Sequence, residues 1–143
     1  MTPDNILTKT LVLDAPVCLA WFLSNPSEDL PAESLLETLT SHTCLVPQNW
    51  WFETRNMLLE AEQAHRIEPS ETAGILADLS VLPIQTDTMP NSDVCLALGR
   101  KHQISASEAA YLELATRTNS PLITLSQPFL LAAPGEGVET RFS

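Results

Sequence analysis

The sequence predicts one α/β domain with a central, mostly parallel sheet between two layers of helices. Short apolar runs that suit buried strands alternate along the chain with longer segments whose apolar residues recur at helical spacing. A repeated strand-then-helix order makes the strands parallel, because each helix carries the chain back across a face of the sheet. The 143 residues fall in the commonest size range for one domain, and no linker, repeat or low-complexity tract divides residues 1–143.

The first half of the chain opens with a strand that leads directly into a helix. Apolar runs predict strands at residues 11–13 and 43–46. Apolar residues at helical spacing predict helices at residues 17–23, 29–39, 49–64 and 69–79. Pro16 and Pro69 suit a first helical turn, Asp29 is placed to cap the second helix, and Pro47 stops the second strand.

The second half of the chain continues the alternation. Apolar runs predict strands at residues 81–84 and 122–125, and a weaker terminal strand at 138–141. Helices are predicted at residues 90–98, 105–118 and 129–132. Pro90 suits the start of the first of these helices.

The charge balance limits the partners of this chain. Seven Lys and Arg residues against 18 Asp and Glu give a net charge of −11, too few cations for the broad basic stripe of a typical nucleic-acid binder. The chain therefore avoids nucleic acid or binds it locally. Divalent cations or a basic partner protein would neutralise part of the negative charge.

The cellular compartment of the protein is predicted from two features that the sequence lacks. No apolar run approaches the roughly 18 residues that a membrane helix needs, and the first residues lack the basic start and apolar core of a secretory signal. We therefore expect a cytoplasmic protein. The three cysteines are far apart and flanked by apolar residues, so we expect buried thiols in place of disulfides or zinc ligands, at Cys18, Cys44 and Cys95.

Polar residues follow two of the predicted strands. Asp14 ends the first strand and Ser126 ends the strand at 122–125, so both should lie at the carboxyl edge of the sheet, where open parallel sheets bind ligands. Glu53 and Asn56 share one face of a helix, and Glu108 lies in the first turn of another. Converging carboxylates of this kind bind Mg²⁺ or Mn²⁺, which activates water and stabilises charge on a phosphodiester.

Four motifs in order resemble the PIN-domain ribonucleases of the VapC toxin type. The resemblance runs from about residue 11 to residue 129. It rests on the segments LVLDAPV with the nearby WFL, VPQNW leading to Glu53 and Asn56, EAAYLELA from Glu108, and PLITLS ending at Ser126. The resemblance implies a three-layer α/β/α PIN-like fold, endonucleolytic cleavage of RNA with Mg²⁺ or Mn²⁺, a homodimer, and an antitoxin partner. It also implies that Asp14, Glu53 and Glu108 are catalytic metal ligands, with Asn56 orienting them.

Two positions depart from the acids that the family pattern has. Glu108 replaces an Asp, and its extra methylene moves the carboxylate by about 1 Å, which is enough to slow a reaction. Ser126 replaces the last Asp with a neutral hydroxyl, a weaker Mg²⁺ ligand. These substitutions predict weakened activity, or slow cleavage with one metal ion. They also admit a degenerate PIN domain that serves as a protein-binding or dimeric scaffold.

Several of these residues have structural interpretations beside the functional ones. Asp14 suits a helix cap, and Ser105 with Glu108 has the spacing of a capping box. Glu113, on another face of the same helix, is interpreted as a solvated or supporting charge. The adjacent aromatics at 50–52 point in different directions on a helix, so at least one is expected at an interface, and core packing is favoured over base stacking for each.

Overall fold

Five parallel strands form the centre of the molecule. The computed structural model describes residues 9–23 and 41–141. The strands are β1 (Lys9–Leu13), β2 (His42–Pro47), β3 (Ile84–Asp87), β4 (Leu122–Ile123) and β5 (Thr140–Arg141). They pair in the order β3-β2-β1-β4-β5, and every pair is parallel.

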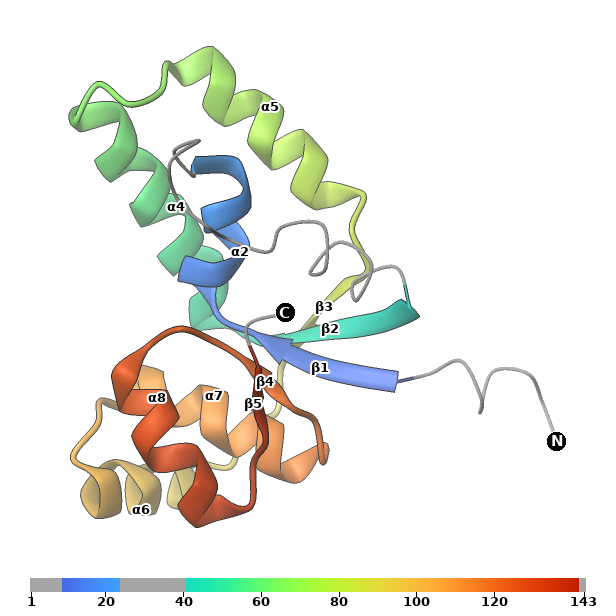
Figure 1. The fold of residues 1–143 in the computed structure, drawn as a ribbon, viewed down its shortest axis with the longest axis vertical. Coiled ribbons are helices and arrows are strands. Elements are labelled where there is room, and N and C mark those ends of the chain that lie inside the picture. Colours follow the sequence, from blue (N-terminus) through green and yellow to red (C-terminus); the bar gives the residue numbers. More distant parts are fainter. Residues whose placement is uncertain (1–8, 24–40, 142–143) are drawn as a thin grey trace, which may run out of the picture.

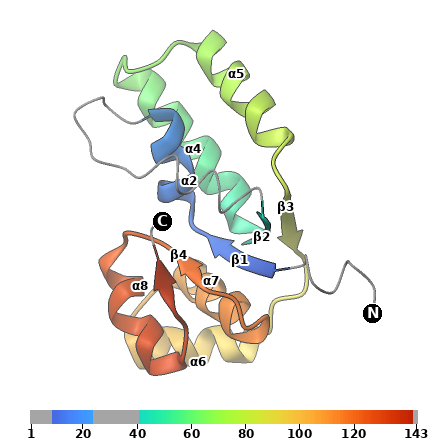
Figure 2. The same ribbon diagram turned by 45° about the vertical axis from the view of Figure 1, so that its right-hand side comes forward.

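Helices cover both faces of this sheet. They are α2 (Ala15–Leu23), α4 (Asn49–Gln63), α5 (Pro69–Ser80), α6 (Ser92–His102), α7 (Ala106–Arg117), α8 (Gln127–Ala132) and the 3₁₀ helix η1 (Ala133–Glu136). Figure 1 shows α2, α4 and α5 on one side of the strands and α6, α7 and α8 on the other, and the turned view in Figure 2 keeps this separation. The predicted three-layer α/β/α architecture is confirmed.

The core is built around the central strand. Leu11, Val12 and Leu13 of β1 are fully buried, because β1 has a neighbouring strand on each side and helices over both faces. This burial explains why the strand is a continuous apolar run without alternation. Helix α7 packs against β1, β2 and β4, and α2 packs on α4, so the apolar faces predicted for these helices lie inward.

The third and fourth strands differ in their bounds from the sequence prediction. The third strand begins at Ile84, opposite Cys44, because α5 continues to Ser80 and Val81 forms its exposed C-cap. The prediction of a strand at 81–84 was therefore wrong by about three residues. Strand β4 ends at Ile123, two residues earlier than predicted. The helix expected at 29–39 lies outside the described residues.

A partly buried ion cluster joins the edge strand β3 to helix α7. Glu113 is only 2% exposed and accepts hydrogen bonds from Arg117 Nε at 2.7 Å and from its terminal nitrogen at 3.0 Å. The same guanidinium donates to Asp87 at the end of β3, at 2.6 Å. The interpretation of Glu113 as a solvated charge was therefore wrong, because the side chain lies under α7 with a cation as its partner.

The three cysteines, Cys18, Cys44 and Cys95, are free and buried, as predicted. Burial raises the pKa of Cys18 and Cys44 to about 12, which leaves these thiols protonated and unreactive at neutral pH. Within the described part of the chain, no helix is long and apolar enough to cross a membrane.

Candidate functional site

A pocket of about 320 Å³ opens at the carboxyl edge of the sheet, beside the end of β1. All five candidate site residues from the sequence analysis line this pocket, although they come from four separate parts of the chain: Asp14, Glu53, Asn56, Glu108 and Ser126. The lining consists of Asp14, Ala15, Pro16, Glu53, Asn56, Met57, Glu108, Tyr111, Ser126 and Phe129. Within this lining three residues are acidic and none is Lys, Arg or His.

Asp14 is held in the pocket by the strand on one side and the helix on the other. Its backbone N–H donates to the carbonyl of Ile123 at 3.2 Å, which fixes the end of β1 against β4. Its Oδ1 accepts from the N–H of Val17 at 2.9 Å, so the residue caps α2 as well as facing the pocket. Its Oδ2 accepts from the hydroxyl of Thr124. Both interpretations of Asp14, cap and pocket acid, are thus compatible in the same side chain.

The carboxyl group of Asp14 is electrostatically strained. The side chain is 1% exposed, and this burial raises its pKa from 3.8 to about 6. The hydrogen bonds from Thr124 and Val17 act in the opposite direction, while the negative charge of Glu53 raises the pKa further. A positive charge in the pocket would offset both the cost of burying the ionised carboxylate and its repulsion by Glu53.

Glu53 is positioned by two donors from different helices. The hydroxyl of Tyr111 on α7 donates to its Oε1 at 2.5 Å, and the amide of Asn49 donates to its Oε2 at 3.3 Å. The same amide donates to the carbonyl of Ser107 at 3.1 Å, which ties the first turn of α4 to the first turn of α7. Burial and the bond to Glu53 raise the pKa of Tyr111, so its phenol remains a donor.

Glu108 serves as a helix cap at the rim of the pocket. Its Oε1 accepts from the backbone N–H of Ser105 at 2.9 Å, and its own N–H donates to the Ser105 hydroxyl at 3.0 Å. The capping box that the sequence predicts is therefore formed. The side chain is half-buried and still borders the pocket.

The remaining residues shape the rim and the floor. Ser126 is the N-cap residue of α8, and its N–H donates to the hydroxyl of Thr124 at 3.0 Å. Asn56 is exposed on α4, one turn beyond Glu53. Met57 and the buried Phe129 give the pocket an apolar side, and the Phe129 ring lies 5.5 Å from that of Tyr111.

The pocket fits a divalent cation in the kind of ligand it offers. Carboxylate, amide and hydroxyl oxygens are ligands for Mg²⁺ and Mn²⁺, and the strained carboxyl of Asp14 beside Glu53 favours positive charge. Within residues 9–23 and 41–141, however, no three His, Cys, Asp or Glu side chains form a group that could hold one ion. The arrangement therefore suits Mg²⁺ bound through one or two carboxylates with water in the other positions.

Sequence reasoning did not identify three residues that organise this site. Thr124 was assigned to the strand interior, although it directly follows the last paired residue of β4. Asn49 stands four residues before Glu53, a spacing that places both on one helix face. Tyr111 carried no sequence signal, because its bond to Glu53 joins residues 58 positions apart.

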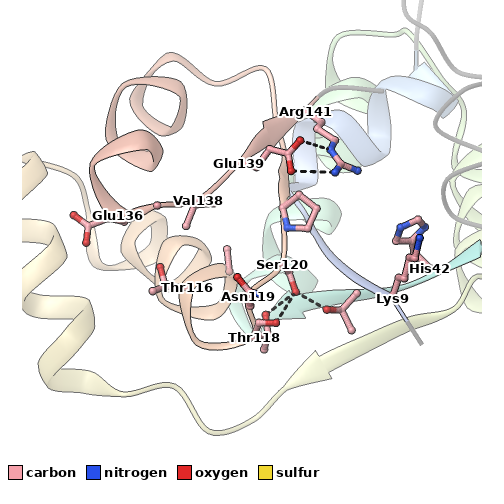
Figure 3. A pocket seen from close by; sticks show the side chains of 14 residues that line it. Lys9, His42, Thr116, Thr118, Asn119, Ser120, Glu136, Val138, Glu139 and Arg141 are labelled. Atoms are coloured by element: carbon pink, nitrogen blue, oxygen red, sulfur yellow. Dashed lines mark hydrogen bonds and ion pairs between the residues drawn. The ribbon is translucent and has the colours of Figure 1, made fainter. Parts of the chain in front are cut away.

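A larger pocket of about 750 Å³ lies at the opposite end of the strands, beside Lys9 and His42 at the starts of β1 and β2. Figure 3 shows that Arg141 pairs with Glu139 and that the hydroxyl groups of Ser120 and Thr118 are hydrogen-bonded. The hydroxyl of Ser120 is also hydrogen-bonded to that of Thr10. Its polar groups are largely satisfied, so this pocket is the weaker functional candidate.

Solved structures provide the link to known proteins, because no protein-family model and no curated protein sequence matches this chain. The crystal structure of PAE2754 from Pyrobaculum aerophilum aligns with a TM-score of 0.70 and 16% identity, over 96% of this chain and 85% of that one. A toxin-antitoxin complex from Klebsiella pneumoniae aligns with a TM-score of 0.57 and 19% identity, over 83% of this chain and 89% of that one. At such identities the likeness concerns the fold, and the fold of this chain is the three-layer α/β/α arrangement of the PIN type.

Proposed function

We propose that this chain is a VapC-like PIN-domain endoribonuclease, the toxin of a toxin-antitoxin pair acting in the cytoplasm. In this proposal Asp14, Glu53 and Glu108 form the catalytic site for Mg²⁺ or Mn²⁺, in which Asp14 and Glu53 bind the ion and Glu108 acts on the attacking water, and the enzyme hydrolyses phosphodiester bonds of RNA. The observation that carries the proposal is that the sequence-predicted residues line one pocket at the carboxyl edge of a PIN-like sheet. The likeness to a structure described as a toxin-antitoxin complex supports the biological setting.

The residues of the pocket have separate tasks in this reaction. Asp14 and Glu53 bind the cation, and their donors hold them in place: Thr124 and Val17 for Asp14, Tyr111 and Asn49 for Glu53. When bound, Mg²⁺ or Mn²⁺ lowers the pKa of a water molecule and stabilises charge on the phosphodiester.

The rim residues act on the substrate in the same scheme. The amide of Asn56 donates to a phosphate oxygen, and the carboxylate of Glu108 accepts a proton from the attacking water. The apolar side formed by Met57 and Phe129 excludes bulk water, which strengthens each electrostatic contact within the pocket.

Two protein partners belong to the proposal. One is a second copy of the chain, which forms a homodimer. The other is an antitoxin-like protein that blocks the pocket, and a basic segment would suit the acidic lining and the net charge of −11.

A second candidate function is a degenerate PIN domain that binds a protein or forms a dimeric scaffold without cleaving RNA. The arrangement of the acids favours it. Ser126 contributes a hydroxyl where the family pattern has a carboxylate, and Glu108 uses one of its oxygens to cap α7. Within the described residues the pocket acids do not form a three-ligand group.

Metal titration tests the proposed function. We would titrate Mn²⁺ and Mg²⁺ into the wild-type protein, Asp14→Asn and the matched control Asp78→Asn, by isothermal calorimetry. Asp78 is an exposed residue of α5, so its substitution makes the same change in charge away from the pocket. We expect saturable binding in the wild type and the control that is lost in Asp14→Asn, with Mn²⁺-dependent cleavage of single-stranded RNA following the same pattern.

The opposite result would support the scaffold. Absence of binding at millimolar Mn²⁺, together with RNA that stays intact in the presence of wild-type protein, would remove the nuclease proposal and leave the non-catalytic PIN domain.

A further inference from the structure

One side of helix α4 presents large apolar side chains outside the core. Trp51 is 50% exposed, Phe52 65% and Leu59 54%, whereas the adjacent Trp50 is buried. Successive residues of an α-helix are rotated by about 100°, so residues 51, 52, 55 and 59 lie on one side of α4. We call the part formed by Trp51, Phe52 and Arg55 the aromatic face.

The aromatic face is ordered by contacts within α4. The rings of Trp51 and Phe52 lie 5.0 Å apart at an interplanar angle of 74°. The guanidinium carbon of Arg55 lies 4.2 Å from the centre of the Trp51 ring, in a cation–π contact. Arg55 is fixed there by donating to the hydroxyl of Thr54 at 3.0 Å and to the carbonyl of Trp51 at 3.4 Å. Two partly exposed aromatic rings and a positive charge are therefore held side by side.

The aromatic face adjoins the candidate active site. Phe52 directly precedes Glu53, and Asn56 follows one turn later on the same helix; Glu53 and Asn56 both line the pocket. The helical rotation places Phe52 beside Asn56, at the boundary between the outer side of α4 and its pocket side. A chain-like ligand that crosses the rim at Asn56 therefore passes over Phe52.

The charge of Arg55 favours an anionic occupant. Among the residues that the structure describes, Lys101, Arg117 and Arg141 are in ion pairs, whereas no carboxylate lies within ion-pair distance of Arg55. Aromatic rings beside an unneutralised guanidinium are the combination that binds unpaired bases and phosphates.

We propose that the aromatic face binds single-stranded RNA, with an unpaired base stacked on Phe52 or Trp51 and the adjacent phosphate near Arg55. This inference rests on the proposed function, because it supplies the substrate of the same pocket. It explains how a chain with a net charge of −11 binds RNA locally without a broad basic surface. It also departs from the sequence-based preference for core packing of these aromatics, which holds for Trp50 alone.

The aromatic face is tested by measuring the binding of a fluorescently labelled single-stranded RNA oligonucleotide. Fluorescence anisotropy reports the binding, with Ca²⁺ in place of Mg²⁺ or Mn²⁺. We would compare the wild type with Trp51→Leu and Phe52→Leu, singly and together, because leucine keeps apolar area but removes the ring face. Leu59→Ala is the control, since it truncates an exposed side chain on the same side of α4 that has no ring to stack. Loss of base stacking should weaken the double variant by about tenfold or more, with the control within about twofold of the wild type.

The same RNA annealed to its complement should bind more weakly and should not respond to the leucine substitutions, because its bases are paired. Unchanged affinity of the double variant for single-stranded RNA would overturn the inference. An equal loss of RNA affinity in Leu59→Ala would also overturn it, because the effect would then not depend on a ring. A loss of self-association in ultracentrifugation with RNA affinity preserved would overturn it as well, because that result identifies a protein interface. Failure of the two proposals is distinguishable: cleavage that persists with unchanged RNA affinity in the double variant refutes the aromatic face alone, and ring-dependent binding without cleavage refutes the nuclease alone.

Discussion

The hydroxyl group of Thr124 donates a hydrogen bond to Oδ2 of Asp14, joining the ends of two neighbouring strands, β1 and β4. Because Oδ1 is bonded to Val17, both oxygens of this carboxylate have a fixed direction. Thr124 is therefore a positioning residue for the acid at the centre of the pocket.

Replacing Thr124 by valine should raise the pKa of Asp14 above its already raised value, because the hydrogen bond from Thr124 lowers this pKa in the native protein. The substitution should also reduce stability by about 1.5 to 3 kcal/mol, the usual contribution of a hydrogen bond to a charged group. The pKa is measured by NMR titration of the carboxyl carbon. Thr10→Val removes a hydroxyl bond at the other end of β1 and should leave the Asp14 pKa unchanged; an equal change in that variant would contradict the assignment.

Asp14 should make the protein less stable as the pH rises. Its pKa is about 6 in the folded protein against the ordinary 3.8, so the folded state holds the proton more tightly. The stabilisation is fully present below the unfolded pKa and is lost as the pH rises towards 6, by up to about 3 kcal/mol. Urea unfolding of the wild type and Asp14→Asn between about pH 4 and pH 7 isolates the contribution of Asp14 to the pH dependence of stability, because the other carboxylates are common to both proteins.

The pH experiment has a metal-dependent counterpart. Mn²⁺ that binds the ionised folded state should restore stability at neutral pH in the wild type and not in Asp14→Asn. A stability difference between the two proteins that is independent of pH would show that the proton on Asp14 is not linked to folding.

Ser126→Asp should increase Mn²⁺ affinity and Mn²⁺-dependent RNA cleavage by about tenfold or more, because a carboxylate is a much stronger ligand than a hydroxyl. Ser126→Asn is the control of equal size without charge. The measurement is the initial rate of RNA cleavage at saturating RNA. Equal rates for the two variants would mean that this position does not reach the cation, and would favour the scaffold function.

Arg117→Ala should destabilise the protein by about 2 to 3 kcal/mol, because it leaves the buried carboxylate of Glu113 without its cation. The value is below that of a fully buried pair, since Arg117 itself is partly exposed. Arg100→Ala, on an exposed part of α6, should change stability by less than about 0.5 kcal/mol. The free energies come from urea unfolding, and Glu113→Gln combined with Arg117→Ala should recover part of the loss.

Local chemistry explains which parts of the fold were predictable. The run Leu11–Leu13 and the capping box of Ser105 and Glu108 act within a few residues, so both could be predicted directly from the sequence. The start of β3 was misplaced because Val81 and Leu82 have the composition of a strand, whereas the helix before them continues to Ser80. Nothing within that segment reveals that Ile84 pairs with Cys44.

The acids of the candidate site could be predicted from the sequence, but the residues that hydrogen-bond to them could not. Asp14 follows a buried strand and Glu53 shares a helix face with Asn56, and both facts are visible in the sequence. Tyr111 reaches Glu53 from another helix, and Thr124 reaches Asp14 from another strand. Such contacts depend on how elements pack, and no local pattern encodes them.

The double use of Glu108 couples the folding of α7 to the composition of the pocket. The same carboxylate closes the first turn of α7 through Ser105 and borders the pocket. Replacing it by the shorter Asp would detach the cap, so a change of the acid at the rim would also destabilise the first turn of the helix. The chemistry of this position therefore cannot be altered independently of folding.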